Sequence, residues 1–345
     1  MKFDVIIGNP PYQLNDGSIE QNASLSSALY HLFVDKALEL DPNYISMIIP
    51  SRWMTRSARG IPDEWINKMI NDKRIKEMHD FTNSDNLFAG VGIMGGVNYF
   101  LWDKNYSGKC SFYQHKENEV KSKEMYLNTK GSNIVIRNIE AISILDKVES
   151  EDKGYIQNKS SNFSHLVSSK NYFTEITATS RILTSNWDKY SDKKSEENYL
   201  KYYMSGGNIG WISPKQVPRN EDAIDMHKVY IPAAHGGHSQ VLGYPIYGEA
   251  GSACSQSFLV IGYKHSLTKE ECLNIISYIK TKFFRFMVKI KKTTQNGARG
   301  VYQFVPMQDW SKSWTDEELY KKYKLTQEEI DYIEDNIDPM PSSDD

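Results

Sequence analysis

The chain has 345 residues, a formal net charge of −3, 39% hydrophobic and 25% charged residues, a composition typical of a globular protein with two ordinary domains. Its small net charge excludes a histone-like DNA binder, so nucleic-acid contacts would need a local basic patch. No apolar run approaches the roughly 20 residues of a membrane span, and no secretory signal opens the chain. Three isolated cysteines, Cys110, Cys254 and Cys272, argue against disulfides and structural zinc and favour a cytoplasmic protein.

The first predicted element is a strand over residues 3–7, which leads into Asn9-Pro10-Pro11-Tyr12. Its unbroken apolar run is typical of a buried parallel strand, and ligands bind at the carboxyl ends of such strands. An Asn9 carbonyl and a main-chain carbonyl made rigid by proline can accept both hydrogens of a conjugated amine and activate it toward a methyl donor. The Tyr12 ring offers a flat face to a flipped base. The alternative is a Pro-Pro turn that merely ends the strand.

The following segments alternate between helix and strand. Apolar spacing predicts a helix over 28–38, which Ser24 or Ser26 could cap, and a second helix that begins near Pro62. Further strands are predicted at 44–49, 75–81, 97–102 and 109–113. The last two would form a hairpin across the turn at 107–108. This order predicts an α/β sheet.

The opening segment also carries a resemblance to a known family. Its sequence is Phe3-Asp-Val-Ile-Ile-Gly-Asn-Pro-Pro-Tyr12. It resembles motif IV of the γ-type DNA adenine-N6 methyltransferases, and more narrowly the methylase part of type IIG and related restriction–modification enzymes. The resemblance implies the second half of a Rossmann-like methyltransferase sheet, S-adenosylmethionine as cofactor and double-stranded DNA as partner. It also implies that Asn9 and Pro10 bind the target amine and that Tyr12 stacks on the target base, with Pro11 completing the catalytic tetrapeptide.

A second resemblance lies at residues 87–91, Leu-Phe-Ala-Gly-Val. It is similar to the family's motif VIII, whose aromatic ring stacks on the opposite face of the flipped base, and it implies this role for Phe88. The alternative is a core residue at a strand end. The adjoining residues 90–95 match GxGxxG, but a dinucleotide loop must follow a strand and open a helix. Polar residues precede these glycines and a predicted strand follows them, so we interpret them as a turn before Val97.

The predicted domain boundary lies near residue 125, within the polar segment 116–135. Residues 1–125 would form the catalytic methyltransferase half. Residues 126–345 mix short strand-like runs, glycine-rich connections, a long helix over 269–291 and an acidic helical tail, which predicts a mixed α+β domain. This part is similar to the target-recognition domain of the same enzymes, so the resemblance covers nearly the whole chain.

A basic cluster lies in and after the long helix, with no acidic residue between positions 279 and 300. It consists of Lys280, Lys282, Arg285, Lys289, Lys291, Lys292 and Arg299. Such a cluster would contact DNA phosphates and supply affinity rather than sequence reading. A solvated helix face is the alternative. His235 and His238 lie in a glycine loop without nearby carboxylates or cysteines, so no metal site is expected.

We recognise no donor-binding loop in this sequence. The γ order places that loop before Asn-Pro-Pro-Tyr, and a permuted order places it downstream, between a strand and a helix. The nearest downstream match, residues 206–210, precedes Pro214 and Pro218, which disfavour a helix. The predicted strands are about half of a seven-stranded sheet and would leave an exposed apolar edge. We therefore expect a chain that is incomplete alone and that works with an upstream methyltransferase half or a restriction subunit.

Two other functions stay open. A catalytically inactive DNA-specificity subunit would bind duplex DNA, and Asn9→Ala would leave that binding unchanged. A methyltransferase acting on RNA or on protein glutamine could use the same tetrapeptide, although the large second domain favours DNA. No endonuclease signature stands out in the sequence.

Overall fold

The structure, a computed structural model, describes residues 2–13, 27–88, 90–116, 119–235, 241–292 and 295–340. The chain divides into two compact units, Met1–Ser143 and Ile144–Asp345. This division lies after the predicted boundary at residue 125, because the segment that follows returns to the first unit. There the Val135 N–H donates to the carbonyl oxygen of Met54 at 2.9 Å. Each unit is described by itself.

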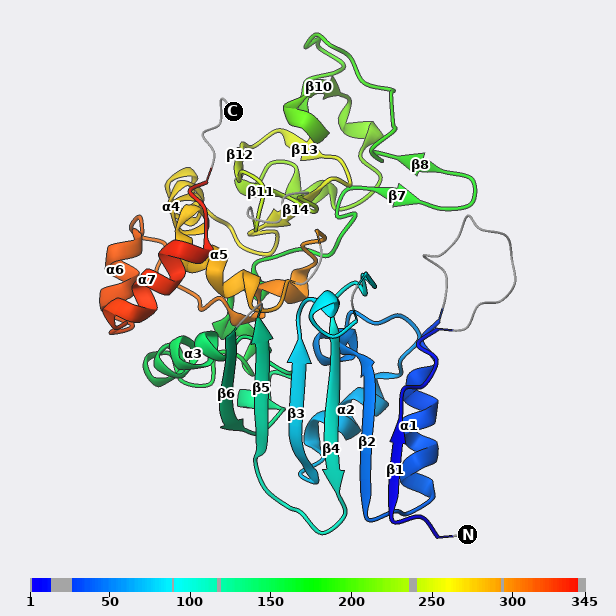
Figure 1. Cartoon of the computed structure of the whole chain (residues 1–345). Coiled ribbons are helices and arrows are strands. Elements are labelled where there is room, and N and C mark those ends of the chain that lie inside the picture. The colour runs from blue at the N-terminus through cyan, green and yellow to red at the C-terminus, as the bar shows by residue number, and fades with distance from the viewer. Residues whose placement is uncertain are drawn as a thin grey trace. The chain divides into compact units, whose positions relative to one another are not determined.

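The first unit is an α/β sheet with the strand order β1-β2-β4-β3-β5-β6 (Figure 1). Its strands are β1 (Val5–Gly8), β2 (Tyr44–Pro50), β3 (Ile75–Phe81), β4 (Val97–Asp103), β5 (Cys110–Lys116) and β6 (Glu119–Met125). Its helices are α1 (Tyr30–Glu39), α2 (Asp63–Asn71) and α3 (Ile139–Glu151), with the division between the units falling inside α3. β1 is parallel to β2, and β4 is antiparallel to both β2 and β3. The predicted α/β, Rossmann-like half-sheet is confirmed.

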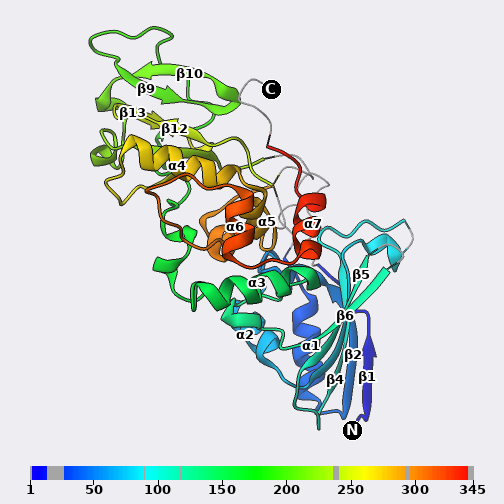
Figure 2. The same cartoon turned by 90° about the vertical axis from the view of Figure 1, so that its left-hand side faces the viewer.

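Helices α1 and α2 cover the same face of this sheet (Figure 2). Each follows a parallel strand, and right-handed crossovers in one direction place their helices on one face. Helix α2 buries Trp65, Ile66, Met69 and Ile70, the stripe expected from its spacing. The predicted capping residues of the first helix, Ser24 and Ser26, lie outside the described residues.

Strand β1 is an edge strand and not the buried strand that its apolar sequence predicted. Val5 is 51% exposed and Ile7 79% exposed. The reason is that β1 pairs only with β2 among the strands that the structure describes. An apolar run reports a preference for burial, but a neighbouring strand must be present to satisfy it.

The hairpin at the other edge also differs from the prediction. It is formed by β5 and β6, whereas β3 lies between β4 and β5. Strand β4 lies between β2 and β3, and its Phe100 and Trp102 side chains are buried, as expected of an internal strand. Strand β6 lies within the polar segment that the sequence predicted as a domain boundary. Charged side chains on an edge strand of this kind discourage pairing with a further strand.

The second unit combines small sheets with two pairs of helices. Its strands are β7 (Glu175–Ile176), β8 (Arg181–Ile182), β9 (Leu200–Tyr203), β10 (Ile209–Ile212), β11 (Lys228–Pro232), β12 (Ile246–Gly248), β13 (Ser252–Cys254) and β14 (Phe258–Ile261). They form the sheets β10-β9-β13 and β12-β11-β14 and the hairpin β7-β8. Its helices are α4 (Lys269–Lys280), α5 (Lys282–Lys289), α6 (Asp316–Lys322) and α7 (Gln327–Asn336).

The long helix predicted over 269–291 is interrupted at Thr281. The backbone of this residue is extended, with φ −63° and ψ 148°, and its hydroxyl accepts from the Phe284 N–H at 3.1 Å. Thr281 therefore ends α4 and caps α5. Apolar spacing continues through the break, so periodicity alone did not reveal it.

The glycines at 90–96 form a turn that leads into β4, as the sequence predicted. Gly96 has φ +78°, and a Cβ at this position would lie 2.0 Å from the Phe81 carbonyl oxygen. A Cβ at Gly92 would meet open space. Gly96 is therefore required by the backbone.

Gly96→Ala is expected to lower the free energy of unfolding by about 2 kcal/mol or more, because it combines a left-handed backbone with a main-chain clash. The matched variant Gly92→Ala should stay within about 0.5 kcal/mol of the wild type. Chemical denaturation followed by circular dichroism measures both. Equal losses in the two variants would contradict the assignment of the constraint to Gly96.

Candidate active site

The tetrapeptide Asn9-Pro10-Pro11-Tyr12 follows directly after β1, at the carboxyl end of that strand. Pro10 is buried, Asn9 is exposed and Tyr12 is half-buried. The Tyr12 carbonyl oxygen accepts from the Leu29 N–H at 3.1 Å, which ties the segment to the start of α1. The two prolines fix φ, so the segment is rigid from the strand end to this hydrogen bond.

The side chains of Asn9 and Tyr12 both carry polar atoms without a hydrogen-bond partner among the described residues. Across the described ranges, the Asn9 amide has no hydrogen-bond partner. The Tyr12 hydroxyl is buried without a partner, and burial raises the pKa of this group. A free amide offers one carbonyl acceptor and two N–H donors. The end of β1 is therefore followed by a hydrogen-bond acceptor, the Asn9 carbonyl, and by an aromatic ring three residues later, that of Tyr12.

The loop that carries Phe88 lies at the same edge of the sheet, because it follows β3, which runs in the same direction as β1 and β2. Ser84 organises this loop. Its hydroxyl donates to the Val91 carbonyl at 2.6 Å and accepts from the Ile93 N–H at 2.7 Å. Phe88 is half-buried, and its N–H donates to the Ser84 carbonyl at 2.8 Å. Tyr12 and Phe88 therefore both lie on the side of the sheet where β1, β2 and β3 have their carboxyl ends, with β2 and β4 between the strands that they follow. Stacking of these rings on a base stays a prediction.

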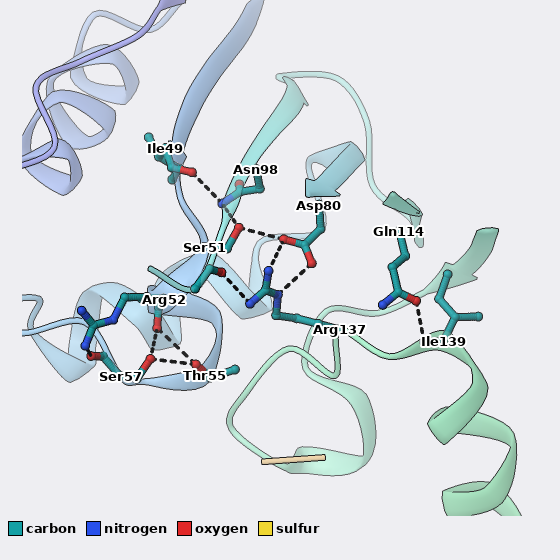
Figure 3. A network of polar contacts seen from close by, with 11 residues as sticks. Ile49, Ser51, Arg52, Thr55, Ser57, Asp80, Asn98, Gln114, Arg137 and Ile139 are labelled. Carbon is teal, nitrogen blue, oxygen red and sulfur yellow. Dashed lines mark hydrogen bonds and ion pairs between the residues drawn. The ribbon is translucent and has the colours of Figure 1, made fainter. Parts of the chain in front are cut away.

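A buried ion pair fixes the strand ends at this edge (Figure 3). Asp80 in β3 is fully buried and accepts from Nε of Arg137 at 2.7 Å, from Nη2 of Arg137 at 2.8 Å and from the Ser51 hydroxyl at 2.7 Å. A buried carboxylate is costly unless it is paired and hydrogen-bonded. The bidentate geometry satisfies both oxygens.

The same network reaches β4 and the loop of Phe88. Arg137 Nη1 donates to the Gly95 carbonyl at 2.8 Å, and the Ser51 N–H donates to the Gly96 carbonyl at 3.0 Å. Asn98 Nδ2 donates to the Ile49 carbonyl at 3.1 Å. Asn98 Nδ2 also donates to the Ser51 hydroxyl at 3.3 Å, so the network as a whole ties the end of the loop to the ends of β2 and β3 and to the start of β4.

Sequence reasoning missed both Asp80 and Arg137. The available signal was weak: Asp80 stands two residues after Met78, on the inward-facing side of β3. A carboxylate at an inward position needs a cation. Nothing in the sequence indicates which of the 41 lysines and arginines supplies it.

Most cations of the predicted DNA-binding cluster have partners inside the second unit. Lys282 Nζ lies 2.6 Å from Glu334 Oε2, and Lys289 Nζ donates to the Asn336 carbonyl at 2.8 Å, so both hold α5 to α7. Lys280 contacts the Tyr244 hydroxyl, Lys291 donates to Gln303, Arg299 donates to the Ser164 carbonyl, and burial lowers the pKa of Lys292. A phosphate would compete with these partners, and DNA contact by these residues stays a prediction.

Arg285 requires a correction. It is only 2% exposed, and burial lowers the pKa of its guanidinium. Its donors bond to the main-chain carbonyls of Thr281, Lys280 and Asp338. Arg285 therefore braces the end of α4 against the C-terminal segment and does not present its charge to a DNA phosphate.

The described residues alone do not fit the donor cofactor. Residues 205–207 form a short turn in the antiparallel β9–β10 hairpin, and the turn at 90–96 leads into β4. Neither opens a helix, which an adenosyl-binding loop of this fold requires. His238 lies outside the described residues. Within them, there is no group of three or more side chains suited to a metal ion, and no helix long and apolar enough to cross a membrane.

A Rossmann-like half-sheet with Asn-Pro-Pro-Tyr at the end of a parallel strand is typical of methyltransferase domains that methylate amino groups. Residues 1–88 match the family described as Eco57I restriction-modification methylase. An uncharacterized adenine-specific methylase of Mycoplasma pneumoniae is 43% identical over 125 residues, which are 36% of this chain and 29% of that protein. The resemblance carried by the opening segment is confirmed.

Two solved structures are similar at greater distance. The type IIG restriction endonuclease BpuSI is 12% identical, with 94% of this chain and 49% of that chain covered and a TM-score of 0.34. The type IIL restriction-modification enzyme MmeI in complex with DNA is 9% identical, with 86% and 44% covered and a TM-score of 0.40. This chain thus spans less than half the length of these enzymes and under a third of the Mycoplasma relative.

Arg137→Ala is expected to lower the free energy of unfolding of the first unit by about 3–5 kcal/mol, because it leaves the Asp80 carboxylate buried and unpaired. Lys104→Ala removes an exposed ion pair with Asp41 (2.6 Å) and should cost about 1 kcal/mol or less. Denaturant titration of both variants measures the difference. A loss for Arg137→Ala no larger than that for Lys104→Ala would refute the role of the network.

Proposed function

We propose that this chain supplies the target-base pocket and the DNA-recognition part of an S-adenosylmethionine-dependent, site-specific DNA adenine-N6 methyltransferase in a restriction–modification system. The observation that carries the proposal is the rigid Asn9-Pro10-Pro11-Tyr12 segment at the carboxyl end of β1, with an Asn9 amide that has no partner among the described residues. The methylase family match over residues 1–88 and the adenine-specific relative support it.

The chemical task of this segment is activation of the adenine N6 amine. The nitrogen lone pair is delocalised into the ring, so the amine is a weak nucleophile. The Asn9 side-chain oxygen and the Pro10 carbonyl accept the two N6 hydrogens, which makes the nitrogen pyramidal and directs its lone pair out of the ring plane. Pro10 is buried and φ is fixed at both prolines, so the acceptors need no reorganisation during the reaction.

The aromatic residues hold the flipped base. Tyr12 stacks on one face and Phe88 on the other, and both follow strands that end at the same edge of the sheet. Stacking against an aromatic ring contributes about 1–3 kcal/mol per base, which offsets part of the cost of removing the base from the duplex. The Asp80–Arg137 network keeps the Phe88 loop in place through Gly95.

The exposed edge of β1 supports a proposal for where a donor-binding part is attached. Val5 and Ile7 are exposed there, and an exposed apolar edge strand is a template for another strand. We place a strand of a donor-binding segment on this edge, from an upstream methyltransferase half, a restriction subunit or the same polypeptide. In open α/β sheets, ligands bind beside the strands at which the strand order reverses. A donor-binding strand paired with β1 would create such a reversal next to Asn9.

Asn9→Ala is expected to lower adenine-N6 methylation by roughly 10²–10³-fold, the usual effect of removing one preorganised polar group. The measurement is sequencing-based detection of N6-methyladenine in DNA from cells that produce the chain together with the rest of its system. Asn105→Ala is the matched control, because Asn105 is exposed in the loop after β4, at the opposite edge of the sheet. Unchanged methylation in the Asn9 variant would overturn the assignment, and DNA binding without methylation by the wild type would favour a specificity subunit.

The purified chain alone is expected to show no binding of S-adenosylmethionine in titration calorimetry, because the described residues contain no glycine-rich turn that opens a helix. Circular dichroism on the same sample confirms that the chain is folded. One-site binding by the chain alone would contradict the proposed division of labour and would place the donor pocket within this chain.

A further inference from the structure

A polar hollow of about 360 Å³ lies in the second unit, beside the β7–β8 hairpin. Its lining includes Arg181 from β8, Asn186, Trp187 and Lys189 from the segment that follows, and Gln256 from the turn before β14. Pockets for small ligands are mostly apolar. This hollow is lined mainly by hydrogen-bonding side chains, which suits a polar surface better than an apolar molecule.

Three of the lining side chains are available to a ligand. Arg181, Asn186 and Lys189 are exposed, and within the described part of the chain their side chains have no hydrogen bond or ion pair. The charged residues of the lining are Arg181, Lys189 and Asp188, so two positive charges face one negative charge and the net charge is +1. The hollow is therefore suited to an electronegative partner.

The backbone next to the lining residues is strained at Leu183, which directly precedes Thr184 of the lining. Leu183 is fully buried and has φ +56°, which is an outlier for a bulky residue. Its carbonyl oxygen accepts from the Gln256 N–H at 3.0 Å and from the Thr174 hydroxyl at 3.2 Å. Gln256 Nε2 also donates to the Ser185 hydroxyl at 2.8 Å. Such strain persists only where the surroundings over-determine it, and it concentrates at binding sites.

The backbone bends at Leu183, between Arg181 in β8 and Asn186 in the segment that follows. Trp187 packs edge-on against Tyr202 of β9, with ring centroids 5.6 Å apart, which anchors the segment on the other side of Asn186. The side chains of Arg181, Asn186 and Lys189 are therefore attached to a well-supported backbone. A site that recognises a fixed pattern of hydrogen-bond donors and acceptors needs such support.

We propose that this hollow and the β7–β8 hairpin form a site that reads base edges in the major groove of duplex DNA, with Arg181 selecting guanine and Asn186 selecting adenine. Arginine pairs with the O6 and N7 atoms of guanine, and asparagine with the N6 and N7 atoms of adenine. The major groove admits a two-stranded β-ribbon, and the hairpin projects from the second unit as such a ribbon (Figure 1). The inference rests on the proposed function and names the specificity-determining residues of its recognition part.

The test is selection of duplexes from a random-sequence library by the purified full-length chain, followed by sequencing of the bound pool. The wild type is expected to enrich one motif. Arg181→Ala should reduce the preference for guanine at one position of that motif, and Asn186→Ala the preference for adenine at a nearby position, each by roughly 5- to 150-fold. Both residues are exposed, so the variants are expected to fold.

Lys215→Ala is the matched control, because Lys215 is exposed in the same unit but does not line the hollow. It should keep the wild-type motif. If the wild type enriches a motif and both hollow variants enrich the same motif with the same strength, the inference is wrong and the proposed function stands. If the wild type enriches no motif, the DNA recognition in the proposed function fails and the inference fails with it.

Discussion

The buried ion pair between Asp80 and Arg137 is the constraint on which the geometry of the first unit depends. It joins the ends of β2, β3 and β4 to the loop that carries Phe88, at the edge where Asn9 also lies. A wholly buried carboxylate is tolerated only while all its donors remain in place. The segment after β6 must therefore return to the sheet and deliver Arg137, which is why the first unit extends beyond the last strand.

The two units use their polar groups in opposite ways. In the first, the Asn9 amide has no partner among the described residues, and the apolar residues Val5 and Ile7 of the edge strand are exposed. In the second, the acidic tail neutralises the basic helix: Lys282 pairs with Glu334, and Arg285 is buried on main-chain carbonyls. Among the described residues of that unit, Arg181 and Lys189 are two exposed cations without a side-chain partner, and both line the hollow near the strained backbone of Leu183.

The pairing of these cations within the second unit bears on the proposed DNA recognition. A run of lysines and arginines without acidic neighbours in the sequence acquires acidic and carbonyl neighbours from distant segments once the chain is folded. Phosphate contacts give affinity without sequence information, whereas base edges require a few rigid, unpaired donors and acceptors. The hollow beside the β7–β8 hairpin carries exposed donors and acceptors of this second kind, on Arg181 and Asn186.

The sequence by itself determined the local elements and the chemistry of the tetrapeptide. Strand β3 and helix α2 lie where the apolar spacing predicted them, and Asn-Pro-Pro-Tyr identified the methylase domain, because periodicity and short motifs are properties of neighbouring residues. Only the tertiary structure decided that β1 is an exposed edge, that β4 inserts between β2 and β3, and that Asp80 meets Arg137. These outcomes depend on which distant segments become neighbours, and a pattern along the chain shows which face seeks burial but not what will cover it.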